Sequence, residues 1–342
     1  MALSRHFRAL VGAAFIQAAL LPRADAEVIL SDGFEDPPPP VPVIGGCPIL
    51  PADNMWNTPV DTAPLHPDSS TYISYIGPGT SLHPDFGTSW AGQDIGIPLN
   101  IVPSGQARVP IRFEWWDESD LEADRCDTGG AQDTGCYPIP DNPAIEGAPL
   151  DEGDRHVLIL EQESCKLYET FATTNAPGYW IGGSGAIWDL SLNQQRPQGW
   201  TSADASGLAI LPGLIRYDEV MVEGEIRHAI RFTLSSIRSA YIPPASHSDG
   251  RAGCSTSAPA MGQRFRLRAD FDISGFSAPV QVILRAMKKW GIVLTDTGSN
   301  MYISGEHHDN WDDEMLAELS QVTAGDFEAV YTGDPVGYGS CQ

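Results

Sequence analysis

The stretch that decides how the chain is interpreted is Gly224-Glu225-Ile226-Arg227-His228-Ala229-Ile230-Arg231-Phe232. Side chains on a strand alternate between two faces, so one face carries Ile226, His228, Ile230 and Phe232. The opposite face carries Arg227, Ala229 and Arg231. The stretch therefore predicts a core strand with one histidine in its apolar row.

A second stretch repeats this order of residue types at Gly153-Asp154-Arg155-His156-Val157-Leu158-Ile159-Leu160. Both stretches begin with glycine and an acid and reach Arg-His before an aliphatic run. His156 shares a face with Leu158 and Leu160, as His228 does with its aliphatic neighbours. Two alternatives stay open: the histidines converge in one site, or each is a core residue bonded to buried carbonyls.

The two ends of the chain differ in composition from its middle. Basic residues, an apolar run over 9–21 and Ala24-Asp25-Ala26 predict a secretory signal peptide over 1–26. The proline run 37–40 predicts an extended linker over 27–46, followed by a single β-rich domain over 47–342. We therefore expect a secreted protein, periplasmic or extracellular.

The formal charge is −25 over 342 residues. This field repels nucleic acid and anionic membrane surfaces, so neither is expected as a partner. It also disfavours a strongly anionic polymer unless a local basic pocket overrides it. We expect a monomer whose ligand is a polysaccharide or a small glycan.

The six cysteines predict disulfides, because an even count in an exported chain favours bridges over metal or redox chemistry. Cys126 with Cys136 is the first expected pair, since the glycine-rich segment between them needs bracing. Cys47 with Cys341 is the second, as a tie between the chain ends. No Cys-x-x-Cys occurs, so a zinc ribbon is not expected.

The hydrophobic pattern predicts a mainly β protein: a single-domain antiparallel β-sandwich or barrel-like fold with two short C-terminal helices. The first helix is predicted from the helical spacing of Val280, Ile283, Leu284 and Met287, and the second covers 312–321. Loops and short strands are expected over 47–100. The predicted strands are 108–116, 154–160, 166–172, 179–190, 225–234 and 263–271, with a hairpin over 292–304.

Two polar clusters invite a catalytic or metal-binding interpretation. Glu118, Asp120 and Glu122 have the E-x-D-x-E spacing of some retaining glycosidases, but the neighbouring sequence favours an acidic loop. His307-His308-Asp309 offers metal-ligand types, although adjacent residues on a loop rarely form a site unaided. We therefore predict no metal site and no cofactor, with a structural Ca²⁺ in the acidic loop as the alternative.

The motif around His228 resembles one in a family of exported bacterial proteins. The matching segments are Gly224 to Ile230 (G-x-I-x-H-A-[LI]), Pro244-Ala245, Ser248-Asp249-Gly250 and Met261 to Leu267 (G-x-R-[FL]-x-L). The resemblance implies export and a single domain. It assigns no catalytic residue.

The composition leads to two functional hypotheses. The first is a secreted carbohydrate-active enzyme, a polysaccharide hydrolase or lyase; its catalytic candidates are His156, His228, Asp154, Glu225, Glu219 and Asp249. In this hypothesis Asp154 or Glu225 orients an imidazole or serves as the acid. The residues proposed to bind substrate are Trp90, Trp180, Trp200 and Asp204. The alternative is a non-catalytic glycan-binding or surface protein in which those tryptophans form a shelf. A serine hydrolase and a nucleotide site lack their motifs.

Overall fold

The predicted core strand is present but shorter than its sequence pattern. In the computed structural model, which describes residues 41–150 and 153–341, strand β14 runs Ile230–Leu234 and is buried along its length. The preceding residues leave the π-helix η4 (Glu219–Glu223) at Gly224, whose φ is 71°. The N–H of Ala229 donates to the Trp56 carbonyl, so strand pairing starts only at Ile230. His228 is therefore buried just before the strand rather than within it.

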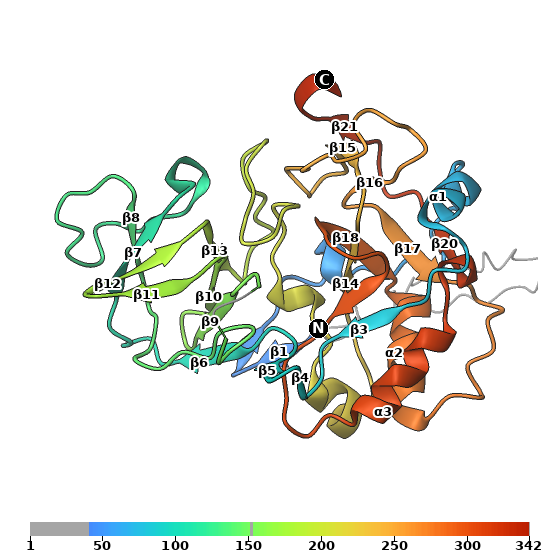
Figure 1. Ribbon diagram of the computed structural model, residues 1–342, viewed down its shortest axis with the longest axis horizontal. Helices are drawn as coiled ribbons and strands as arrows, with labels where there is room; N and C mark the ends of the chain where they lie inside the picture. Colours follow the sequence, from blue (N-terminus) through green and yellow to red (C-terminus); the bar gives the residue numbers. More distant parts are fainter. Residues whose placement is uncertain (1–40, 151–152, 342) are drawn as a thin grey trace, which may run out of the picture. The chain divides into compact units, whose positions relative to one another are not determined.

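β14 lies inside a six-stranded sheet with the order β20-β17-β18-β14-β19-β3 (Figure 1). Its other strands are β20 (Phe327–Ala329), β17 (Arg264–Leu267), β18 (Ile292–Thr297), β19 (Tyr302–Ser304) and β3 (His83–Asp85). The predicted hairpin over 292–304 is wrong, because β14 pairs between β18 and β19. Both strands exist, but the segment joining them donates its N–H groups at Gly298 and Met301 to β14 carbonyls.

Two four-stranded sheets form a sandwich. One has the order β13-β10-β9-β6 and the other β11-β12-β7-β8. The first contains β13 (Gly185–Asp189), β10 (Lys166–Thr170), β9 (Val157–Glu161) and β6 (Leu99–Val102). The second contains β11 (Thr174–Ala176), β12 (Tyr179–Gly182), β7 (Val109–Phe113) and β8 (Thr134–Tyr137). Their facing side chains share one buried cluster, including Ile159 and Tyr168 from the first sheet and Ile111 and Tyr137 from the second.

The predicted mainly β, sandwich-like fold is therefore confirmed, and no closed barrel forms among the described residues. Antiparallel pairs predominate, while β7–β12, β6–β9, β14–β18, β19–β3 and β15–β16 pair in parallel. Strand β9 joins the two cores: Val157 and Ile159 belong to the sandwich core, and Leu158 and Leu160 to the larger core around β14. His156 precedes β9 in the row of Leu158 and Leu160, as its spacing predicts.

The remaining pairs and helices complete the larger core. The short strands are β1 (Val43–Ile44), β2 (Cys47–Pro48), β4 (Ser89–Trp90), β5 (Gln93–Asp94), β15 (Arg238–Tyr241), β16 (Ala260–Met261) and β21 (Val336–Gly337). The α-helices are α1 (Ser69–Ile76), α2 (Ala278–Lys289) and α3 (Asp313–Leu316). The 3₁₀ turns are η1 (Met55–Asn57), η2 (Trp116–Glu118), η3 (Leu211–Gly213), η5 (Ala317–Gln321), η6 (Ala324–Asp326) and η7 (Gly339–Cys341).

The two predicted C-terminal helices are confirmed. All four residues of the predicted apolar stripe of α2 are buried, and α3 continues into η5 over the predicted span. Helix α1 was not predicted, since loops and strands were expected there; it buries Tyr72 and Ile76, which lie four residues apart on one helical face. No helix among the described residues is long and apolar enough to cross a membrane.

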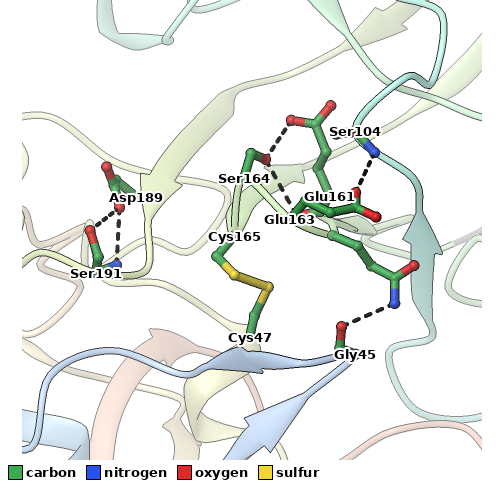
Figure 2. Close-up of a disulfide and its surroundings, with 10 residues drawn as sticks. Gly45, Cys47, Ser104, Glu161, Glu163, Ser164, Cys165, Asp189 and Ser191 are labelled. Carbon is green, nitrogen blue, oxygen red and sulfur yellow. Dashed lines mark hydrogen bonds between the residues drawn. A yellow bond between two sulfur atoms is a disulfide. The ribbon is translucent and has the colours of Figure 1, made fainter.

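Three disulfides brace the chain. Cys126–Cys136 is confirmed, but the predicted Cys47–Cys341 pair is wrong: Cys47 pairs with Cys165 and Cys341 with Cys254. Figure 2 shows the Cys47–Cys165 disulfide, which ties β2 to the turn between β9 and β10. Gln162 in that turn also donates to the Gly45 carbonyl (3.0 Å). The hairpin β1–β2 thus packs against the sandwich, and folded structure begins before Cys47. The predicted signal peptide and residues 27–40 of the predicted linker lie outside the described residues.

The glycine-rich segment 179–190 forms two strands in different sheets, β12 and β13, and crosses between them at Gly183 and Ser184. A Cβ on Gly185 would lie 2.6 Å from the Tyr137 hydroxyl oxygen and closer still to Cζ of Phe113. The glycines thus permit close packing of the two sandwich sheets, as glycines within strands often do.

We predict that Gly185→Ala destabilises the protein by about 3 kcal/mol, since the methyl group forces two buried aromatic rings to move. Gly105→Ala is the matched control, because nothing lies within 4 Å of its Cβ position. Urea unfolding of both variants measures the difference. Equal midpoints for the two variants would contradict the prediction.

Candidate functional site

A buried arginine on the central strand organises the polar groups of the site. The Arg231 Nε donates to Oδ2 of Asp204 at 2.7 Å. Its Nη2 donates to Oδ2 of Asp296 at 2.9 Å, and its Nη1 to the Ser304 hydroxyl at 2.6 Å. Each guanidinium nitrogen therefore has a partner, which compensates the cost of burying the charge.

A β-bulge brings Asp296 to this arginine. Arg231 pairs with Val293 across the β14–β18 ladder, but Thr233 pairs with Asp296 because the register shifts after Phe232. Residues two apart on a strand share a face, so the bulge places Asp296 on the face of Arg231. In an unshifted register Thr295 would occupy that position.

The two carboxyl groups that Arg231 binds differ in environment. The Asp204 side chain has no exposed surface, whereas that of Asp296 is 19% exposed. Burial, followed by the negative charge of Asp204, raises the pKa of Asp296 to about 7. The second oxygen of Asp204, Oδ1, is buried without a hydrogen-bond partner among the described residues. The arrangement thus holds, beside Asp204, one carboxyl group that is partly protonated at neutral pH.

These two carboxyl groups line a pocket of about 330 Å³. Glu118, Asp249, His247 and hydroxyls of the 201–205 segment also line it. Trp115 and Phe171 form an aromatic wall, with ring centroids 6.0 Å apart and planes inclined by 16°. The pocket combines several carboxyl groups with a flat apolar surface, which is a set of groups that suits a polyhydroxylated ligand.

His156 lies behind the pocket wall. Its Nε2 is 3.0 Å from the carbonyl oxygen of Ala203, and its Nδ1 is 2.5 Å from the Glu146 carboxylate. Although burial opposes a charge here, the Glu146 carboxylate raises the pKa of His156 to about 9. Burial likewise opposes ionisation of Glu146, yet the His156 charge lowers the pKa of that carboxyl group. The pair is therefore an imidazolium–carboxylate ion pair that positions the 203–204 segment.

His228 belongs to a different buried cluster. Its Nδ1 is 2.8 Å from the Ala229 carbonyl oxygen, and its Nε2 is 3.1 Å from the Glu219 carboxylate, which also binds Arg216 at 2.6 Å. Although burial acts against it, the charges of His228 and Arg216 lower the pKa of Glu219. His156 and His228 have different carboxylate partners, and neither lines the pocket, so the structure does not bring them together as a catalytic pair.

The other three predicted catalytic residues lie in three different environments. Asp249 lines the pocket and accepts a hydrogen bond from the Thr297 hydroxyl at 2.6 Å. Asp154 is exposed and acts on the pocket only through its charge, which raises the pKa values of His156 and Asp296. Glu225 pairs with Arg227 at the surface and contacts neither histidine.

Of the predicted substrate-binding residues, only Asp204 lines the pocket. Trp90 is 74% exposed at the β4–β5 hairpin, and Trp180 is only 7% exposed because it packs in the sandwich core. The Trp200 ring is half-buried beneath the Arg196 guanidinium, 5.4 Å from its centroid. These three rings therefore do not form the predicted shelf, and the aromatic wall comes from Trp115 and Phe171 instead.

The acidic residues 118–122 have three separate partners. Glu118 accepts from the Thr201 N–H, Asp120 pairs with Arg196, and Glu122 pairs with Lys166 at 2.7 Å. They do not lie on one strand face, because this segment is a 3₁₀ turn and a loop. Over residues 41–150 and 153–341, no group of three or more His, Cys, Asp or Glu side chains could hold a metal ion.

Sequence reasoning did not select Arg231 or Asp296. A usable signal for Arg231 is its position inside the apolar run Ala229-Ile230-Arg231-Phe232, because a charge on a buried strand needs a buried partner. Asp296 ends the run Ile292-Val293-Leu294-Thr295-Asp296, and only the bulge reveals which face it occupies.

The ion pair between His156 and Glu146 predicts a pH-dependent stability. The raised pKa of His156 contributes stability that is fully present below the ordinary value of 6.5 and is lost as pH rises through about 9. Over that range wild type should lose roughly 3 kcal/mol relative to Glu146→Gln, whose His156 has no anionic partner. Urea unfolding at pH 6.5 and 9.5 measures this, with the surface variant Glu225→Gln as control. Parallel losses in wild type and Glu146→Gln would exclude the effect.

Comparison of the chain with protein-family models, with curated proteins and with solved structures gives no match. The resemblance of the His228 motif to exported bacterial proteins therefore stays a prediction.

Proposed function

We propose that this protein is an exported enzyme that hydrolyses glycosidic bonds in a polysaccharide or small glycan, with Asp296 as the general acid. The observation that carries the proposal is the environment of Asp296. Its carboxyl group is accessible from a pocket, bonded to Arg231, and has a pKa raised to about 7. A general acid works best when its pKa lies near the working pH.

A second carboxyl group on the same pocket supplies the other half of the reaction. Asp249 is exposed and accepts a hydrogen bond from the hydroxyl of Thr297. Thr297 follows Asp296 directly in β18, so this bond orients Asp249 toward the strand that carries the acid. In the proposed reaction the proton of Asp296 moves to the leaving glycosidic oxygen as the C–O bond breaks. The carboxylate of Asp249 then activates water or bonds to the anomeric carbon before water replaces it. The products are one new reducing end and one new hydroxyl group.

The walls of the pocket support a sugar ligand. The stacked Trp115 and Phe171 rings offer an apolar face of the kind that packs against a pyranose ring. Four acids line the pocket, so an uncharged sugar fits this position better than an acidic one. In the segment 201–205, Thr201 Oγ1 and Asp204 Oδ1 have no hydrogen-bond partner among the described residues and can bond to its hydroxyls.

The charge of His156 argues against its use as the base of an elimination reaction. A lyase needs an unprotonated base to remove a proton from carbon. His156 is held as a cation by Glu146, so it does not supply that base. Glycoside hydrolysis uses two carboxyl groups on one site, and Asp296 and Asp249 both line this pocket.

Export is part of the proposal and rests on two observations. The first 26 residues have the pattern of a secretory signal peptide, and the folded part carries three disulfides, which persist in oxidising compartments.

The second candidate is a glycan-binding protein without catalysis. It is favoured by the full burial of Asp204 and by the tight pairing of both acids with Arg231, which are also features of a purely structural ion-pair network. In that case the aromatic wall binds sugar and no bond is cleaved. Saturable glycan binding without turnover on a broad panel would favour this candidate.

The first functional prediction concerns the acid itself. Asp296→Asn keeps an oxygen that accepts from Arg231 but cannot donate the catalytic proton, so turnover should fall by about 10²–10⁴-fold. Turnover is measured on a polysaccharide panel by the release of reducing ends, with unsaturated products followed by absorbance. Asp270→Asn, an exposed aspartate paired with Arg268, is the control and should keep full activity. Wild-type turnover in Asp296→Asn would exclude the assignment.

The second functional prediction concerns the charge that tunes the acid. Since Asp296 must be protonated, wild-type kcat/KM should fall as pH rises through about 7. Asp204→Asn removes the neighbouring negative charge, so the pKa of Asp296 should fall. The alkaline limb of the pH profile, where kcat/KM decreases, should then move to lower pH. The pH profile separates this effect from a loss of folding, which lowers activity at every pH without shifting the limb. An unshifted limb would show that Asp204 does not set the pKa of the acid.

A further inference from the structure

A second pocket lies over another buried arginine, Arg264 in β17. The pocket has a volume of about 500 Å³, and Arg264 is one of its lining residues although only 4% of its surface is exposed. Four side-chain amides also line it: Asn54, Asn193, Gln194 and Gln195. The rest of the lining is mostly apolar or backbone, with Asp53 as its one acid.

Arg264 differs from Arg231 because no carboxylate compensates its charge. Its Nη2 donates to the carbonyl oxygens of Thr58 (2.8 Å) and Trp290 (2.6 Å). Its Nε is buried without a hydrogen-bond partner among the described residues, and no carboxylate there forms a salt bridge with it. Burial lowers the pKa of Arg264 to about 10, so the group is still charged at neutral pH. A buried cation that lines a pocket and has no carboxylate partner is a binding group for an anion.

The two pockets open from one face of the central sheet. Arg231 and Arg264 are both paired with Val293, from opposite sides of β18. Directly paired residues project to the same face, and neighbouring strands are ~4.8 Å apart, so the two arginine backbones are separated by roughly 10 Å. Segments 193–205 and 243–249 contribute lining residues to both pockets.

We propose that the Arg264 pocket binds the carboxylate of a uronic acid residue, with the amides of Gln194 and Gln195 on its rim bonded to the sugar hydroxyls. A guanidinium N–H that has no other partner donates a charge-assisted hydrogen bond to a carboxylate oxygen, and Gln amides both donate to and accept from hydroxyls. The binding of a carboxylate rests on Arg264 alone, whereas the choice of a sugar acid rests on the proposed glycan hydrolysis. The ligand would be a glycan that presents an acidic sugar here and an uncharged sugar at Asp296.

The test is a titration of the mature protein with D-glucuronate, D-glucose and acetate, followed by calorimetry and by the NMR signal of the Arg264 Nε–H. Glucuronate should saturate and shift that signal, with glucose and acetate binding at least ~10-fold more weakly. Absence of saturable glucuronate binding would overturn the proposal. Acetate binding as tight as glucuronate binding would overturn the assignment to a sugar acid.

Variants of one rim residue locate the site. Gln195 is exposed, lines the pocket and makes no side-chain hydrogen bond among the described residues, so it can change without loss of folding. Gln195→Glu should weaken glucuronate binding several-fold and Gln195→Lys should strengthen it, since the added charges have opposite sign. If both variants changed the affinity for glucuronate in the same direction, the cause would be a structural disturbance, and the proposed location of the site would be overturned. Gln132→Glu, at an exposed loop position outside the pocket, is the matched control and should not change binding.

Two further variants separate this site from the proposed reaction. Asp296→Asn should bind glucuronate like wild type even where turnover is lost, so failure of the enzyme proposal leaves the binding result intact. A change in affinity with Asp296→Asn but not with Gln195→Glu would place the anion in the other pocket and overturn the inference. Arg264→Met should abolish binding in protein whose circular dichroism spectrum matches that of wild type.

Discussion

The compensation of one buried positive charge constrains the centre of this structure. Arg231 projects from a strand that is buried along its length, and an unpaired guanidinium in that position would cost several kcal/mol. Its three partners come from three other parts of the chain: the 201–205 segment, β18 and β19. Satisfying this one side chain therefore fixes the β18 bulge, the path of the 201–205 segment and the position of Ser304. The unequal environments of the two aspartates follow from the same requirement.

Elements defined by a strong local period could be predicted from the sequence. Helix α2 is an example, because Val280, Ile283, Leu284 and Met287 mark one face without ambiguity and Gly291 ends the pattern. The strands β9, β10 and β7 are also where their patterns place them. Partner choice could not be predicted in the same way: β18 and β19 are adjacent in sequence, yet β14 separates them. Pairing depends on long-range contacts, which local pattern does not encode.

The residues of the candidate site also divide into those that the sequence pattern indicates and those that it does not. His156 and His228 stand out in the sequence because a polar residue in an apolar row is unusual, and both are buried as their rows predict. Burial alone does not determine what they bind, and each is paired with its own glutamate, Glu146 or Glu219. Asp296 carries the chemistry proposed here, but its position depends on a one-residue register shift. Such a bulge leaves no clear trace in a single sequence, although bulges are frequent near active sites.

The contrast between the two buried arginines links the charge of the chain to its ligand. The sequence holds 45 acidic and 20 basic side chains, so a buried arginine has many potential carboxylate partners. Arg231 has two of them and forms an acid-rich pocket, whereas Arg264, paired with the same Val293, has only carbonyl partners. In a chain with this excess of acidic side chains, a buried cation without a carboxylate partner is free to bind an anionic ligand. One sheet face thus presents an acidic pocket suited to proton donation and, two strands away, a positive group suited to an anion. A glycan that carries both uncharged and acidic sugars would be complementary to both.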